Sequence, residues 1–143
     1  MRYELAVEIA RPPAEVYAFL ADPSNLPLWQ EEVEEVRGTT GKPLPAGTTF
    51  TEVRTFMGKR VESVLEITAS EPGREFSLRS LSGPVSFSAR HLLQPTDDGT
   101  LLRLVGEADP GKLLGLAGPL VRKVAERRAH TDFDRLKSRL EEA

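Results

Sequence analysis

Residues 11–30 read RPPAEVYAFLADPSNLPLWQ, and the architecture of the whole chain follows from this stretch. Its two leading prolines stop a preceding strand and pre-set the backbone for the first turn of a helix. Val16, Phe19 and Leu20 stand at i, i+3 and i+4, which predicts a short amphipathic helix from about residue 13 to residue 21. Such a helix must bury its apolar stripe against another element.

The segment after this helix is itself apolar. Asp22-Pro23 ends the helix, and Ser24 is of the residue type that caps a second, shorter helical turn ending near Trp29. Leu26 and Trp29, the only tryptophan, lie in that turn. Exposed apolar surface is costly in water, so we expect another part of the fold to cover these side chains.

The flanking sequence predicts strands and one long terminal helix. Residues 3–9 alternate apolar and polar side chains, which predicts a half-buried strand. Short links rich in Gly, Pro and Asp separate the later strands, so we expect an antiparallel sheet. These strands are predicted at 32–39, 47–56, 60–69, 75–82, 85–94 and 101–109. From residue 112 to residue 142 the apolar side chains follow a 3.6-residue period, which predicts a helix across the sheet.

Length and composition restrict the classes of protein. With 143 residues the chain is expected to form one domain over residues 1–143. It has no cysteine, which excludes disulfides, and no apolar run reaches the ~18 residues of a membrane span. The first ten residues alternate and carry charge, unlike a signal peptide, so we expect a cytoplasmic protein. A net charge of −3 argues against a general nucleic-acid binder, and the basic residues 121–128 are expected to form a solvated helix face.

Several motifs carry a family resemblance. They are IARPPAEVYAFLADP at 9–23, NLPLW at 25–29, the hairpin sequence GKRVE at 58–62 and SGPV at 82–85. Together with the order of predicted elements they resemble the SRPBCC superfamily, whose fold is called START-like or helix-grip, and most of all its polyketide cyclase/dehydrase branch. The resemblance covers essentially the whole chain. It implies an α+β fold in which a curved antiparallel sheet of about seven strands wraps around the long C-terminal helix, with the two short helices after the first strand closing one end.

The resemblance also implies a ligand cavity between the long helix and the sheet. A hairpin turn at Gly58-Lys59 would place Phe56 opposite Val61, and alternation from that pair identifies the inward side chains of each strand. Small helix residues such as Ala125 would leave volume there, although close packing of helix on sheet is an alternative. The expected ligand-lining residues are Phe19, Trp29, Phe50, Phe56, Ser63, Leu65, Phe76, Leu78, Phe87, His91, Leu104, Val121 and Ala125.

Polar residues on the inward set are the candidates for chemistry. A buried Glu52 and Arg54 must pair with each other or bind something, because an unpaired buried charge is too costly. Three interpretations stay open for them: solvated positions near a strand end or on the outer face, orientation of a ligand head group, and catalysis. His91 is a core or rim histidine or a base, and in an apolar pocket a lowered pKa would leave it neutral and suited to a ligand hydroxyl or carbonyl. Residues 110–119, rich in Gly and Pro, form either a gate at the cavity mouth or a simple loop.

Three hypotheses for function follow. The first is a cofactor-free module that binds a small hydrophobic molecule, namely a lipid, polyketide, isoprenoid or aromatic compound. The second is a polyketide cyclase or aromatase that uses His91, Glu52 or Arg54 for proton transfer or enolate stabilisation. The third is a protein-interaction module without a cavity, acting through the outer sheet face or the Arg-rich part of the last helix. Two histidines 39 residues apart and no cysteine argue against a metal site, and the sequence leaves monomer and dimer equally open.

Overall fold

The computed structural model describes residues 1–56, 58–109 and 118–143, with the backbone alone for Val121. Its elements are β1 (Arg2–Ile9), α1 (Pro13–Leu20), the 3-10 turn η1 (Pro23–Asn25), α2 (Leu26–Trp29), β2 (Val33–Arg37), β3 (Thr49–Phe56), β4 (Lys59–Glu71), β5 (Glu75–Ser80), β6 (Ser86–Thr96), β7 (Gly99–Asp109) and α3 (Gly118–Glu141).

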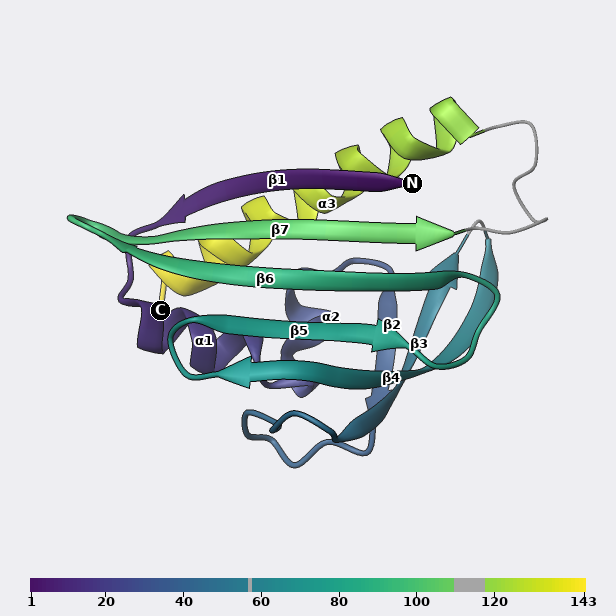
Figure 1. Ribbon diagram of the computed structural model, residues 1–143, viewed down its shortest axis with the longest axis horizontal. Helices are drawn as coiled ribbons and strands as arrows, with labels where there is room; N and C mark the ends of the chain where they lie inside the picture. The colour runs from purple at the N-terminus through teal and green to yellow at the C-terminus, as the bar shows by residue number, and fades with distance from the viewer. Residues whose placement is uncertain (57, 110–117) are drawn as a thin grey trace.

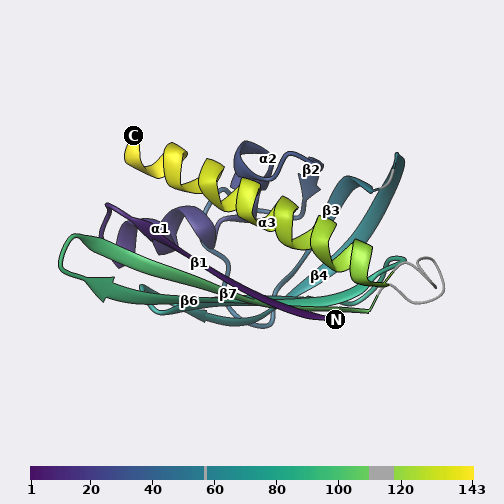
Figure 2. The ribbon, with the colours of Figure 1, turned by 90° about the horizontal axis from the view of Figure 1, so that it is seen from above.

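The strands form one antiparallel sheet of seven, in the order β1-β7-β6-β5-β4-β3-β2. Strands β2 to β7 pair with their neighbours in sequence, and β1 pairs with the last strand at one edge. Helix α3 lies along the concave side of this sheet. On the same side, α1 lies toward the end opposite the start of α3, and α2 lies nearer the middle, beside α3 (Figures 1 and 2). The expected α+β helix-grip fold, with two short helices after the first strand, is therefore confirmed.

The two short helices form where the prolines and the apolar spacing predict them. Pro12 has an extended backbone at the N-cap of α1, and Pro13 occupies the first helical turn, where no amide donor is needed. The cap of the next turn differs from the prediction. It is Asp22, whose carboxylate accepts hydrogen bonds from the amide and the hydroxyl of Ser24 at 3.0 and 2.6 Å. Asp22 caps the turn because its carboxylate accepts both hydrogen bonds at once, whereas Ser24 already lies inside the turn.

The hairpin of β3 and β4 is shifted by two residues from the predicted pairing. Phe56 lies opposite Lys59 rather than Val61, because residues 57 and 58 alone connect the strands. Gly58 takes a φ of 79°, which glycine adopts without strain. A shift by two residues leaves every side chain on its predicted face, because side chains along a strand alternate with a period of two.

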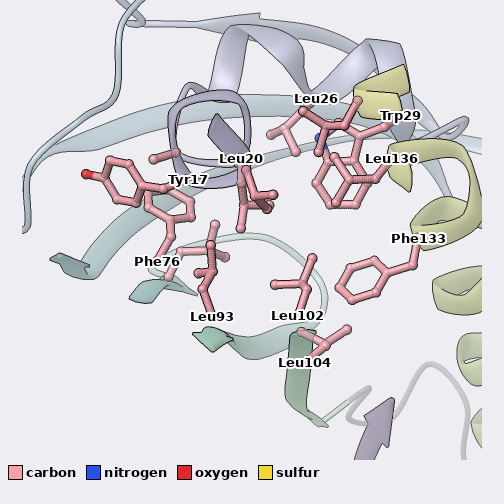
Figure 3. Packing of buried hydrophobic residues seen from close by; sticks show 14 of the residues in the cluster. Tyr17, Leu20, Leu26, Trp29, Phe76, Leu93, Leu102, Leu104, Phe133 and Leu136 are labelled. Carbon is pink, nitrogen blue, oxygen red and sulfur yellow. The ribbon is translucent and has the colours of Figure 1, made fainter. Parts of the chain in front are cut away.

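The core joins the short helices to the C-terminal half of α3. Phe133 and Leu136 project from α3 toward Trp29, and Leu102 and Leu104 lie below them on β7 (Figure 3). The rings of Trp29 and Phe133 are 6.0 Å apart between centroids, within the range of attractive aromatic pairs. This packing covers the apolar segment between α1 and β2 for which the sequence required a partner.

Backbone and side-chain hydrogen bonds hold the same half of α3 to the end of β1. The Arg11 guanidinium donates to the carbonyl of Glu141 at 2.9 Å, and the Lys137 ammonium donates to the carbonyl of Glu8 at 2.6 Å. The Glu141 carboxylate in turn accepts from the amide of Ala10 at 2.8 Å. The C-terminal half of α3 is therefore anchored to the sheet by polar as well as apolar contacts.

Replacing Leu136 by Ala should lower the free energy of unfolding by about 2–5 kcal/mol, since this fully buried leucine would leave a void in the core. Leu120→Ala is the matched control on the same helix, because Leu120 is 65% exposed, and its effect should stay within about 0.5 kcal/mol. Urea unfolding measures both. Equal losses for the two variants would contradict the anchoring of α3 through its C-terminal half.

Candidate functional site

A cavity of about 410 Å³ lies between α3 and the concave face of the sheet. This volume falls within the usual size range of small-molecule sites, about 300–1,000 Å³. Its described walls come from every strand except β2 and from the loop between β5 and β6. Helices α1, η1 and α2, the segment after α2, and α3 supply the rest. Close packing of helix on sheet, the alternative to a cavity, is therefore not what the structure has.

Most residues expected to line the cavity do so. The structure places these at its wall: Trp29, Phe50, Phe56, Ser63, Phe76, Leu78, Phe87, His91, Leu104 and Ala125. Phe19 and Leu65 are not part of the wall, because Phe19 packs against the core from α1 and Leu65 is buried within it. The side chain of Val121 lies outside the described residues, as do residues 110–117 of the expected gate.

The buried Glu52 and the half-buried Arg54 form an ion pair at the cavity wall. Arg54 Nε donates to Glu52 Oε1 at 2.6 Å, and Arg54 Nη2 donates to the side-chain oxygen of Gln30 at 2.8 Å. Glu52 is only 3% exposed, so the solvated outer position considered for this pair is wrong. Burial alone would lower the pKa of Arg54, but the neighbouring carboxylates, Glu52 first, raise it above its ordinary value.

A second arginine, Arg128 of α3, connects the helix to this pair. Arg128 Nε lies 2.9 Å from Glu32 Oε1, and the other carboxylate oxygen of Glu32 lies 4.0 Å from Arg54 Nη1. Arg122 keeps the predicted solvated position and pairs with Glu126 on the surface. Arg128, at the end of the face predicted to be solvated over residues 121–128, is still 40% exposed but also lines the cavity, which the prediction did not include. The sequence could not reveal this because its partner Glu32 lies far away along the chain.

Asp132 and Tyr3 are wall residues that the sequence analysis missed. Asp132 is 7% exposed and its Oδ1 atom has no hydrogen-bond partner in the described part of the chain. Burial raises the pKa of this carboxyl to about 6, although the Glu31 amide and the charges of Arg128 and Arg54 act in the opposite direction. Asp132 lies three positions after Ala129 on the apolar stripe of α3, so the helical period was the signal that could have found it.

Tyr3 reaches the cavity because its cross-strand partner is a glycine. Tyr3 on β1 pairs with Gly106 on β7, and a β-carbon at Gly106 would lie 2.8 Å from Cε1 of the tyrosine ring. The ring therefore lies flat across Gly106 and reaches the cavity wall. Burial raises the pKa of the Tyr3 hydroxyl above its ordinary value.

His91 lines the cavity in a neutral form. Its Nδ1 atom lies 3.0 Å from the carbonyl oxygen of Phe76, which can only accept, so Nδ1 carries the hydrogen. Burial lowers the pKa of His91 to about 4, which leaves Nε2 an unprotonated acceptor at neutral pH. No side chain or backbone group among the described residues donates to Nε2. The site therefore offers a ligand a fixed hydrogen-bond acceptor.

Residues 1–56, 58–109 and 118–143 contain neither a metal-binding cluster nor a membrane-spanning helix. No group of three His, Cys, Asp or Glu side chains in these ranges could hold a metal ion. No helix in them is long and apolar enough to cross a membrane.

Comparison with known proteins agrees with this geometry. The family described as polyketide cyclase / dehydrase and lipid transport matches residues 1–141. No curated protein matches the chain.

Solved structures resemble the whole chain. A START superfamily protein from Mycobacterium smegmatis is 18% identical with a TM-score of 0.81, and the match covers 99% of this chain and 97% of that one. A conserved protein from Geobacillus kaustophilus has 18% identity and a TM-score of 0.80, and the match covers 98% and 95% of the two chains. The protein TTHA0849 from Thermus thermophilus has 24% identity and a TM-score of 0.79, with 98% and 95% covered. At these identities the likeness shows the fold.

The raised pKa of Asp132 predicts a pH-dependent cost to stability. Between about pH 4 and pH 6 the folded carboxyl holds a proton that the unfolded one has lost, so this group lowers stability as pH rises through that window. Asp132→Asn should therefore raise the free energy of unfolding at pH 7.5 by about 1–3 kcal/mol relative to the native protein, and by much less at pH 4.

Urea unfolding at pH 4, 5, 6 and 7.5 checks this, with Asp134→Asn, an exposed position on the same helix, as the control. A gain that does not change with pH, or an equal gain for the control, would contradict the assignment.

Proposed function

The chain belongs to the polyketide cyclase / dehydrase and lipid transport family, a branch of the SRPBCC or START-like superfamily, and from this premise we propose that it binds a small hydrophobic molecule between α3 and the sheet. The observation that carries the proposal is the cavity of about 410 Å³ on the concave face. A lipid, polyketide, isoprenoid or aromatic compound has the apolar surface that such walls bind.

The make-up of the walls supports an apolar ligand. Aromatic and aliphatic side chains from separate strands meet there, among them Phe50, Phe76 and Phe87. Across from them α3 presents Ala125 and Ala129, which are too small to fill the space themselves. Each methylene group that a ligand moves from water into this space contributes about 0.8 kcal/mol to binding.

The same geometry favours binding over catalysis. His91, the first candidate base, is a weak base at neutral pH because burial lowers its pKa to about 4. Glu52 and Arg54, the other two candidates, hold each other at 2.6 Å and are not free for proton transfer. The hypothesis of a protein-interaction module predicts that there is no cavity, so the open volume between α3 and the sheet counts against it.

Trp29 makes the proposal directly measurable. Trp29 is the only tryptophan and lines the cavity. Exciting it should therefore transfer energy to the uncharged fluorescent probe N-phenyl-1-naphthylamine when this probe binds beside it. Titration with this probe should give saturable energy transfer from one site per chain. The absence of saturable transfer would refute the proposed function.

Filling the cavity should abolish that signal. Ala125→Phe adds a phenyl ring at the wall and should weaken probe binding at least about tenfold, or about 1.4 kcal/mol. Ala18→Phe, at an exposed position of α1, is the matched control and should bind the probe like the native protein. Circular dichroism establishes that both variants fold. Unchanged binding by Ala125→Phe would place the probe elsewhere.

A further inference from the structure

The cationic groups at the cavity wall are already engaged by acidic partners. Arg54 donates to Glu52 at 2.6 Å and to Gln30 at 2.8 Å. Arg128 lies 2.9 Å from a carboxylate oxygen of Glu32 and donates to Glu31 at 2.9 Å. Each guanidinium therefore already has a carboxylate partner that offsets its charge.

Negative charge is in excess at this wall. Among the described residues that line the cavity, three carboxylates, those of Glu32, Glu52 and Asp132, face two guanidinium groups. Asp132 Oδ1 is a buried acceptor without a hydrogen-bond partner in the described part of the chain. A ligand carboxylate brought into this site would therefore be both desolvated and repelled.

Asp132 aside, the polar groups that remain free at the wall are uncharged. His91 Nε2 is a neutral acceptor, because Nδ1 donates to the carbonyl of Phe76. The hydroxyls of Tyr3 and Ser63 also line the cavity, and neither makes a hydrogen bond to another described residue. The indole N–H of Trp29, another wall residue, is a buried donor without a partner in the described part of the chain. Hydroxyl groups of a ligand can use such donors and acceptors alike, because a hydroxyl both donates and accepts. An acceptor such as His91 Nε2 gives no hydrogen bond to a carboxylate, which has no proton to donate.

We infer that the cavity selects uncharged ligands that carry a hydroxyl group and discriminates against carboxylates of the same chain length. This inference rests on the proposed function and deepens it, since it assigns the chemical class of the ligand head group. It excludes free fatty acids as preferred occupants and favours alcohols, sterol-like or phenolic compounds.

A matched ligand pair tests the inference on the native protein. 1-Decanol and decanoate have the same number of carbons and differ in the head group, and each is titrated against bound N-phenyl-1-naphthylamine at pH 7.5. Decanol should displace the probe at a concentration at least about tenfold lower than decanoate. Equal displacement, preference for decanoate, or displacement by neither compound would overturn the inference while the proposed function stands. If the probe itself fails to bind, the proposed function fails first and the inference falls with it.

Changing the charge balance tests the cause. Glu32→Gln removes the carboxylate shared by Arg54 and Arg128, so one cationic charge at the wall becomes available. The ratio of decanoate to decanol affinity should then rise about tenfold. Glu31→Gln is the control, because Glu31 also pairs with Arg128 but its side chain is 60% exposed and does not line the cavity. Its ratio should change less than about threefold, because water screens an exposed charge. An unchanged ratio in a folded Glu32→Gln variant would refute the electrostatic origin of the selectivity.

Discussion

The uneven anchoring of α3 is the constraint on which the rest of the structure depends. Its C-terminal half is buried through Phe133 and Leu136, and hydrogen bonds tie it to the end of β1. Toward the other end, Leu120 is 65% exposed and Val124 56% exposed although both border the cavity. The C-terminal half of α3 thus packs into the core, and its N-terminal half covers the cavity. The short helices complete this arrangement, because α2 supplies Trp29 as a partner for Phe133.

The polar network at the cavity wall offsets the cost of burying charged groups among apolar side chains. A carboxylate as buried as Glu52 would be strongly destabilising alone, and Arg54 compensates it at 2.6 Å. Glu32 extends the network to Arg128, so the sheet and α3 share charges across the cavity. The consequence for function is that each guanidinium already has a carboxylate partner, so the wall presents no net positive charge to a ligand.

Local patterns in the sequence predicted the elements, and contacts between distant segments were beyond them. The helix at Pro13–Leu20 and the inward faces of the strands follow from periodicity. The predicted hairpin pairing was off by two residues, but the predicted inward faces stayed correct because side chains alternate along a strand with a period of two. The position of Tyr3 depends on Gly106 across the strand pair, and that of Arg128 on Glu32, so neither can be read from neighbouring residues. The single domain over residues 1–143, the cytoplasmic location and the absence of a cofactor stay predictions.

A crystal structure of the protein with N-phenyl-1-naphthylamine tests the central claim most directly. We expect electron density for the probe between α3 and the concave face of the sheet, in contact with Ala125 and the ring of Phe76. We also expect Phe133 and Leu136 to keep their places against Trp29 when the probe is bound. Density for the probe on the outer face of the sheet, or side chains filling the space beneath Ala125, would contradict it.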